Sequence, residues 1–333
     1  MVPSPRKIAA LAGRALPSVL PLCLSLVSLC AAAFDLQGHR GTRGLEPENT
    51  LAAFERALSI GVNTLELDVG VTADGVVVIS HDPYLNPAIT RDAGGRWLRE
   101  RGPLIRSLTL SQLQTYDVGR IDPATPYARQ FATQQPRDGQ RVPTLASLFE
   151  RVRALGADKV RLNIETKLNP ERPDDTVSPQ AMTSALLDVV RAAGMTDRVT
   201  LQSFDWRSLR LAQQMAPEIP TACLSIQTAN TDNLRDGTWS IGYKLADHGS
   251  APRMVRAAGC RIWSPNGGAV TQALVREAQA LGLQVLPWTI NTTADMQRFV
   301  DWGVDGLITD YPDRLREVLA QRKMPLPAAV APR

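Results

Sequence analysis

The sequence predicts a single α/β domain in which strands and helices alternate to form a closed (β/α)8 barrel, the TIM-barrel fold. Short apolar segments alternate with segments of helical period along most of the chain, and eight of them have the length of a barrel strand. No Ser/Gly linker or change in composition divides the roughly 300 residues that follow the N-terminal segment, which is the size of one large domain.

The predicted barrel strands are short apolar runs, most of which precede a stretch of helical period. These runs lie at residues 34–38, 62–69, 160–165, 198–202, 219–224, 261–264, 283–288 and 304–308. Three helix starts are expected at Asn49, Thr144 and Thr271, because each places a side-chain oxygen just before a helical run, where it can accept a bond from a first-turn N–H group.

One further apolar run, residues 76–79, does not fit a barrel of parallel strands. It follows residues 69–71 after only four residues, which is too short for a parallel crossover and right for a hairpin. We therefore expect an antiparallel excursion on the second barrel strand. Pairing Val71 with Val76 would set His81 opposite Glu66, and a shift of one residue would still leave His81 beside Glu66 and Asp68.

Residues 83–142 form a long insertion, rich in Pro, Gly, Arg and Asp, with only a weak helical pattern. Loops of this length in compact enzymes are often lids or substrate-binding excursions. In a barrel they belong on the C-terminal face, where the chemistry lies. We therefore expect this insertion to cover that face.

Residues 1–33 read as a signal peptide. They contain no acid, carry three basic residues, and run apolar from Ala15 to Cys30 before the small triplet that ends at Ala33. A retained membrane anchor is the alternative, but the apolar stretch is interrupted by prolines and is shorter than the ~20 residues of a spanning helix. The expected protein is exported, periplasmic or secreted, with no stable membrane insertion after cleavage, a barrel domain at 34–321 and a tail at 322–333.

The charge balance argues against a nucleic-acid partner. The chain has 37 Lys and Arg against 33 Asp and Glu, and three of the basic residues lie within 1–33, so the remainder is nearly neutral. A nucleic-acid binder would carry a basic stripe, and the chain has no run of like charge that would serve.

Two cysteines remain after residue 33, Cys223 and Cys260. An exported protein would allow them to pair. Because they lie on segments predicted to be separate barrel strands, however, we expect two small buried apolar side chains and regard the disulfide as the alternative.

Two of the three histidines in the chain, His39 and His81, follow short apolar runs near predicted strand ends. Histidine can both take and give a proton near neutral pH, so this placement predicts an acid/base pair. The third, His248, follows no strand end, and we expect it to be structural or on the surface.

Three carboxylates are expected to meet in the same region. Glu66 and Asp68 are two residues apart and point the same way from one strand, and Glu165 closes a later strand. An all-oxygen set suits one divalent cation, Ca²⁺ or Mg²⁺. The alternative is a buried ion network in which these carboxylates pair with Arg40 and Lys167.

Arg40 and Lys167 are also placed to hold phosphate oxygens, because one follows the first histidine and the other lies two residues beyond the third carboxylate. Lys167 as a solvated loop lysine is the alternative. Phe204 and Trp288 end two predicted strands, where their rings would form either a wall of the substrate pocket or core packing.

Together these segments resemble the glycerophosphodiester phosphodiesterase family, a branch of the phosphatidylinositol-phosphodiesterase-like barrels. The resemblance covers nearly the whole chain after residue 33. It rests on His39-Arg40-Gly41, Pro47-Glu48-Asn49-Thr50, Glu66-Leu67-Asp68, His81-Asp82, Glu165-Thr166-Lys167, Trp288-Thr289-Ile290-Asn291 and the closing Gly303 to Asp310. Thr166 departs from the Ile or Val that is usual in the family.

By this resemblance, Glu66, Asp68 and Glu165 match the metal ligands of the family, and Arg40 and Lys167 match its phosphate contacts. The two histidines match its acid/base pair. Glu48 is expected to touch the metal shell or the hydroxyls of the substrate, or to offset a helix dipole.

The expected activity is metal-dependent hydrolysis of glycerophosphodiesters to sn-glycerol 3-phosphate and an alcohol. A lysophospholipase D-like activity is the enzymatic alternative, and it would need an apolar groove in an insertion that is instead polar. A non-catalytic phosphoester-binding protein is the contrasting class, and it would predict the loss of a histidine or a carboxylate. The sequence leaves open the head group, the metal, and attack by water or by the neighbouring glycerol hydroxyl.

Overall fold

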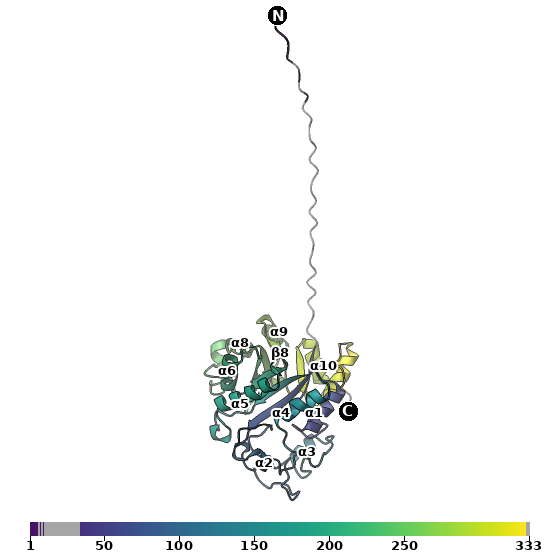
Figure 1. The fold of residues 1–333 in the computed structure, drawn as a ribbon, viewed down its shortest axis with the longest axis vertical. Helices are drawn as coiled ribbons and strands as arrows, with labels where there is room; N and C mark the ends of the chain where they lie inside the picture. The colour runs from purple at the N-terminus through teal and green to yellow at the C-terminus, as the bar shows by residue number, and fades with distance from the viewer. Residues whose placement is uncertain (6, 8, 10–33, 331–333) are drawn as a thin grey trace. The chain divides into compact units, whose positions relative to one another are not determined.

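The structure is a computed structural model that describes residues 1–5, 7, 9 and 34–330 (Figure 1). The predicted signal peptide therefore lies almost wholly outside the described residues. Within the part of the chain that is described, no helix combines the length and the apolar character needed to cross a membrane. The described part of the folded unit begins at Phe34.

Eight parallel strands form the central sheet, in the order β8-β7-β6-β5-β4-β2-β1-β9. They are β1 (Asp35–Gly38), β2 (Thr64–Val71), β4 (Arg161–Thr166), β5 (Val199–Ser203), β6 (Thr221–Ser225), β7 (Ile262–Pro265), β8 (Gln284–Val285) and β9 (Gly306–Thr309). Backbone bonds from Asp305 N to Val285 O (3.1 Å) and from Ile308 N to Pro287 O (3.0 Å) join the two ends of this order. The sheet is a nearly closed barrel, consistent with the predicted TIM-barrel fold.

Helices follow the strands and cover the outside of the sheet (Figure 1). They are α1 (Leu51–Ile60), α4 (Leu145–Ala154), α5 (Pro179–Ala192), α6 (Trp206–Met215), α7 (Leu245–His248), α8 (Ala251–Ala257), α9 (Gln272–Ala280), α10 (Thr293–Trp302) and α11 (Pro312–Gln321). After α11, residues 322–330 turn back onto α1, where Val330 N donates to Leu58 O at 2.9 Å.

Two of the three predicted helix caps are confirmed. The side chain of Thr144 accepts from Ser147 N, and that of Thr271 accepts from Leu274 N. The prediction for α1 was wrong by one residue, because Thr50 is the cap. The side chain of Asn49 instead donates to Asp68 Oδ2 at 2.9 Å, so it serves the barrel interior.

The alternation of side chains along β2 separates the apolar core from a polar barrel interior. Leu65 and Leu67 pack in the hydrophobic core. Glu66 and Asp68 point the opposite way, because successive strand residues face opposite sides of a sheet. Deeper in the barrel, Asn163 Nδ2 donates to Gln37 and to the β5 residue Gln202, each at 3.0 Å. The barrel therefore places polar groups beneath the carboxylates.

The excursion after β2 is antiparallel, as expected, but its register differs by one residue from the prediction. Strand β3 (Val77–Ile79) pairs Val71 with Val77 and Val69 with Ile79. Gly75 adopts a φ of 80°, a left-handed conformation that adds one residue to the turn. His81 is therefore not directly opposite Glu66; the preceding residue, Ser80, donates its N–H to Asp68 O at 2.9 Å.

The insertion at 83–142 contains the short helices α2 (Leu110–Leu113) and α3 (Pro126–Gln130). A small hydrophobic cluster, which includes Leu85, Ile105 and Leu113, packs the insertion against Val78 of β3. The later part of the insertion binds the loop after β1: Arg137 forms two hydrogen bonds with Glu46, at 2.7 and 2.8 Å.

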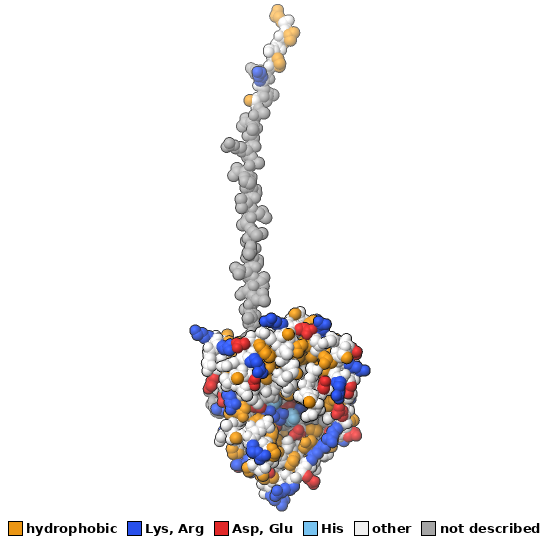
Figure 2. Space-filling model, turned by 180° about the vertical axis from the view of Figure 1, so that it is seen from behind, with side chains coloured by type: hydrophobic (Ala, Val, Ile, Leu, Met, Phe, Trp, Pro, Cys, Tyr) orange, Lys and Arg blue, Asp and Glu red, His pale blue; other side chains and the backbone are white. Residues whose placement is uncertain are grey.

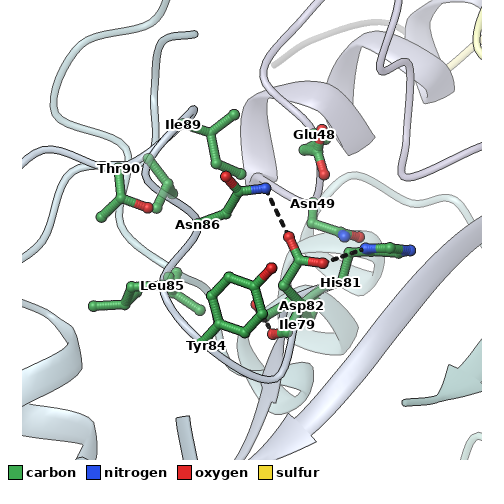
Figure 3. Close-up of a pocket in the computed structure, with 13 residues that line it drawn as sticks. Glu48, Asn49, Ile79, His81, Asp82, Tyr84, Leu85, Asn86, Ile89 and Thr90 are labelled. Carbon is green, nitrogen blue, oxygen red and sulfur yellow. Dashed lines mark hydrogen bonds and ion pairs between the residues drawn. The ribbon is translucent and has the colours of Figure 1, made fainter. Parts of the chain in front are cut away.

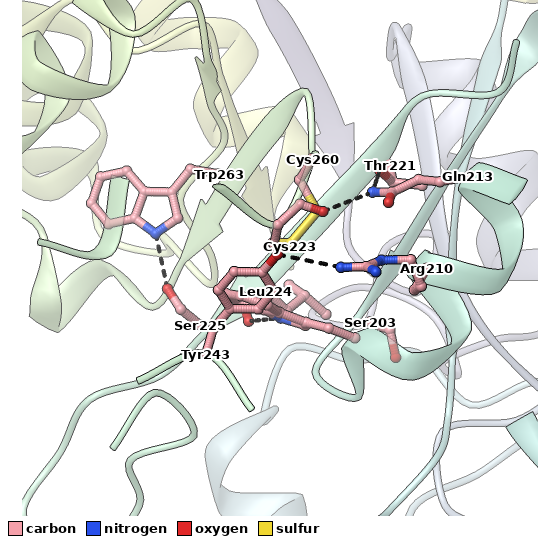
Figure 4. Close-up of a disulfide and its surroundings, with 12 residues drawn as sticks. Ser203, Arg210, Gln213, Thr221, Cys223, Leu224, Ser225, Tyr243, Cys260 and Trp263 are labelled. Atoms are coloured by element: carbon pink, nitrogen blue, oxygen red, sulfur yellow. Dashed lines mark hydrogen bonds between the residues drawn. A yellow bond between two sulfur atoms is a disulfide. The ribbon is translucent and has the colours of Figure 1, made fainter. Parts of the chain in front are cut away.

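Cys223 and Cys260 form a disulfide (Figure 4), contrary to the expectation of two free thiols. Cys223 lies on β6, next to Trp263 on β7, and Cys260 lies two residues before β7 begins. The two strands are separate but adjacent, and adjacent strands are only ~4.8 Å apart. The Cα atoms of the two cysteines are 5.9 Å apart, which suits a disulfide.

Candidate active site

Glu66 and Asp68, on β2, meet Glu165, near the end of β4, as predicted. Asp68 and Glu165 are direct neighbours in the parallel register. One carboxylate oxygen from each of the three residues lies within 4.8 Å of the others, and all three residues are buried. They form a group that could hold a metal ion.

Few neutral groups donate hydrogen bonds to these three carboxylates. Glu66 accepts from Gln202 Nε2 at 2.7 Å and from the backbone N–H of Arg40 at 2.8 Å. Arg40 has a φ of 48°, and this left-handed backbone aims its N–H group at Glu66. Asp68 Oδ1 is buried without a hydrogen-bond partner.

The electrostatics of the group show the cost of crowding three acids. Burial, followed by the charge of Asp68, raises the pKa of Glu66 well above its ordinary value. Burial also raises the pKa of Glu165, to about 7, despite the lowering effect of Lys167. Burial opposes the charged form of Asp68 as well, but the charges of His81, Lys167 and Arg40 lower its pKa. A bound cation would relieve this repulsion.

Arg40 and Lys167 flank the carboxylates. Lys167 Nζ is 2.7 Å from Glu165 Oε1 and 3.6 Å from Asp68 Oδ1. Arg40 is 2.6 Å from Glu48 through Nη1 and 3.4 Å from Asp68 through Nε. The ion pairs expected of a buried ion network are therefore present. Arg40 and Lys167 also line a cavity that contains His39 and His81.

His39 is held in one orientation by the far end of the chain. Its Nδ1 lies 2.7 Å from Asp310 Oδ1, and its Nε2 lies 3.9 Å from Glu66. Asp310 also accepts two bonds from Arg43, at 2.8 and 3.0 Å, and one from Asn291 at 2.7 Å. Burial and the charge of Arg43 lower the pKa of His39 to about 4, although Asp310 opposes this shift.

Sequence reasoning assigned no role to Arg43 or Asp310. Asp310 ends the closing segment of the family resemblance, which was the only signal for it. Nothing in the sequence links it to residue 39, because the contact depends on the parallel pairing of β1 with β9.

His81 is held less tightly than His39, through Asp82, the next residue in the chain (Figure 3). Its Nδ1 is 3.1 Å from Asp82 Oδ1, and Asp82 in turn accepts from Asn86 Nδ2 at 2.7 Å. The side chain of His81 is 31% exposed, against 11% for His39. Burial, with the charges of Arg40 and Lys167, lowers its pKa.

One cavity of about 210 Å³ brings most of these residues together. In Figure 2, histidine atoms are visible in a hollow on the face shown. The rings of Phe204 and Trp288 meet edge to face, with centroids 5.4 Å apart, and form its aromatic side. The predicted site residues that line it are His39, Arg40, Glu66, His81, Glu165, Lys167, Phe204 and Trp288.

Glu48 and Asp68 do not line this cavity. Glu48 instead lines a narrower pocket on the other side of His81, and it accepts a hydrogen bond from the hydroxyl of Tyr127 in the insertion. The cavity that both histidines line combines two imidazoles, which can transfer protons, with cationic side chains, which can bind an anion. It also lies beside carboxylates that could hold a metal.

Comparisons with known proteins agree with this geometry. A sequence model described as the glycerophosphoryl diester phosphodiesterase family matches residues 39–314. A glycerophosphodiester phosphodiesterase from Caldanaerobacter subterraneus is 28% identical over 83% of this chain and 94% of its own length. Among solved structures, a candidate glycerophosphoryl diester phosphodiesterase from Silicibacter pomeroyi is 36% identical, with a TM-score of 0.79, over 88% of this chain and 95% of that one.

A phosphodiesterase from Oleispira antarctica, solved with the product sn-glycerol 3-phosphate, has the same fold. Its TM-score is 0.63 at 23% identity, over 85% of this chain and 96% of that one. The family match spans the barrel from the first histidine to α11 and so includes every residue of the cavity. This chain belongs to the glycerophosphodiester phosphodiesterase family.

Proposed function

We propose that this chain is a metal-dependent hydrolase that cleaves glycerophosphodiesters, the deacylated forms of phospholipids, into sn-glycerol 3-phosphate and an alcohol. Family membership supports the reaction class. The observation that carries the proposal is that His39 and His81 line one cavity together with Arg40, Lys167 and two of the three clustered carboxylates.

Glu66, Asp68 and Glu165 would hold one divalent cation, Ca²⁺ or Mg²⁺. Their ligand atoms are all oxygens, which these cations prefer, and Asp68 Oδ1, which accepts no hydrogen bond, is a ready ligand atom. When bound, the cation neutralises negative charge on the phosphate and on the attacking oxygen. Gln202 and the backbone of Arg40 hold Glu66 in place for this role.

His39 is the proposed general base. Its lowered pKa keeps it neutral at pH 7, and Asp310 fixes the proton on Nδ1, which leaves Nε2 free to accept the proton of the attacking hydroxyl. That hydroxyl belongs either to water or to the neighbouring carbon of the glycerol.

His81 is the proposed general acid, which in its protonated form gives a proton to the departing alcohol oxygen as its bond to phosphorus breaks. A bound phosphate would favour that form, because its negative charge offsets those of Arg40 and Lys167, which lower the pKa of the free His81. Arg40 and Lys167 hold the non-bridging phosphate oxygens, and Arg43, which also lines the cavity, adds a third positive charge. Phe204 and Trp288 form an apolar wall against the carbon atoms of the glycerol. Glu48 positions Arg40 through their ion pair.

Export is part of the proposal. The disulfide between Cys223 and Cys260 supports an oxidising compartment, either the periplasm or the exterior, after removal of residues 1–33 as a signal peptide. The catalytic domain would then be 34–321, followed by the 322–333 tail. The insertion at 83–142 would border the mouth of the barrel, because its Tyr84 and Tyr127 reach the surroundings of His81 and Glu48.

The test is release of sn-glycerol 3-phosphate from glycerophosphocholine by purified protein that lacks residues 1–33. His39→Ala and His81→Ala are each expected to lower kcat by roughly 10²- to 10⁴-fold. His248→Ala is the matched control, because this third histidine lies on α7, outside the cavity. Binding of the substrate without turnover by the metal-loaded wild-type protein would contradict the proposal and favour a phosphoester-binding protein.

A further inference from the structure

A second cavity, of about 530 Å³, adjoins the first. The two share four lining residues, which are His81, Glu165, Lys167 and Phe204, whereas His39 borders only the first. A phosphodiester bound between the imidazoles would therefore direct the substituent on its His81 side into the second cavity. That substituent is the alcohol that leaves.

Carboxylates are prominent at the outer end of this second cavity. Glu171 follows β4, and Asp232 and Asp236 follow β6. Among the described residues, none of the three has a Lys or Arg nitrogen within 4.0 Å. Their hydrogen-bond donors are neutral: Trp239 Nε1 to Glu171 at 3.2 Å, Leu234 N to Asp232 at 2.9 Å and Thr238 N to Asp236 at 3.0 Å.

Two guanidinium groups also line this outer end, and they do not balance its acids. Arg172 lies 3.9 Å from Asp175, a fourth carboxylate in the wall, which also binds Arg101 at 2.8 Å. Arg235 is the second guanidinium group in the lining. Four carboxylates (Glu171, Asp175, Asp232 and Asp236) therefore face three guanidinium groups (Arg101, Arg172 and Arg235), which leaves this end of the wall with one surplus negative charge.

Aromatic rings form part of the same wall, and two of them already face cations. The guanidinium of Arg101 lies 4.2 Å from the ring centroid of Tyr84, and Lys167 Nζ lies 5.9 Å from that of Phe204. Trp239 is the third ring, beside Glu171. Aromatic faces beside carboxylates recognise ammonium groups, because the ring quadrupole and the anions both attract positive charge.

We propose that the second cavity is a head-group subsite for a short amino alcohol that carries an ammonium group, with Glu171, Asp232 and Trp239 as its specificity residues. The inference rests on the proposed function and names the substrate class for it. The surplus of carboxylates disfavours an anionic head group, and their charge disfavours an acyl chain, because an acyl chain would bury them without partners.

The test compares kcat/KM for three substrates that share the glycerol phosphate: glycerophosphocholine, glycerophosphoethanolamine and glycerophosphoglycerol. The wild-type enzyme is expected to prefer the two cationic substrates by about tenfold, which is the range of a partly desolvated cation–π contact with ionic support. Glu171→Gln and Asp232→Asn should each lower kcat/KM for those two by about threefold or more and leave glycerophosphoglycerol unchanged.

Trp239→Leu removes the aromatic ring, and circular dichroism tests whether this variant folds. Glu171 is exposed, so Glu171→Gln is expected to keep the fold. The matched control is Glu150→Gln, which removes an exposed carboxylate from α4, away from both cavities. Equal kcat/KM for the three substrates, or an equal loss on all three in the variants, would overturn the subsite while the proposed function stands. Hydrolysis of none of them would overturn both.

Discussion

The disulfide between Cys223 and Cys260 closes a segment of the chain whose length allows its effect to be calculated. The two residues are 37 positions apart. In the chain-entropy treatment, a crosslink over a loop of this size stabilises the folded state by about 4 kcal/mol at 25 °C. For a domain of this size, that corresponds to a decrease of about 6 to 8 °C in Tm when the bond is reduced.

The assay is thermal unfolding of the protein without residues 1–33, followed by circular dichroism with and without a reductant. Reduction is a cleaner perturbation than mutation, because both cysteines are buried and the thiols keep nearly all of the side-chain volume. The double variant Cys223→Ser/Cys260→Ser is the control, and its Tm should not respond to the reductant.

The closed loop contains α7 and α8, so amide hydrogen exchange on reduction should increase first between residues 224 and 259. A Tm that changes by less than about 2 °C after complete reduction, as measured by thiol titration, would refute the calculation. An equal decrease in the double variant would show that the reductant acts elsewhere.

Three further predictions concern the site. Asp310→Asn should lower kcat by about 100-fold or more and leave metal content unchanged, because a neutral amide replaces the carboxylate that fixes the proton of His39 on Nδ1. Retained turnover would separate Asp310 from catalysis. Chelated protein should lose stability as the pH rises from about 4.5 to 7, because the raised pKa of Glu165 lets the folded state keep a proton in this range that the unfolded state releases. Glu165→Gln should flatten this dependence of Tm on pH. Added Ca²⁺ or Mg²⁺ should restore stability to the wild type at pH 7. Tyr127→Phe should raise KM several-fold with a smaller change in kcat, since it frees Glu48 from the insertion but leaves the histidines in place; unchanged kinetics would limit Tyr127 to packing.

The barrel and the residues of the site could be predicted from the sequence because the signals are local. Strand period fixes which side of β2 carries Glu66 and Asp68, and a histidine directly after a strand must lie at its C-terminal end. Such patterns need only a few neighbouring residues.

The predictions that were wrong depended on competition between neighbours or on distant contacts. The hairpin register depended on the left-handed backbone of Gly75, and the cap of α1 on whether Asn49 was needed elsewhere. The disulfide depended on which strands are adjacent. The contact between His39 and Asp310 spans 271 residues and exists only because the last strand lies beside the first.

The two histidines differ in a way that matters for substrates of varied size. His39 is held by the buried Asp310, on the side of the cavity proposed to bind the glycerol phosphate common to every substrate. His81 follows a hairpin, is more exposed, and touches a single carboxylate from its own neighbour. A tightly held His39 beside the constant glycerol phosphate and a less tightly held His81 beside the variable head group would let one enzyme hydrolyse several glycerophosphodiesters. Substitutions in the second cavity could then change which head group the enzyme prefers without changing the residues that carry out hydrolysis.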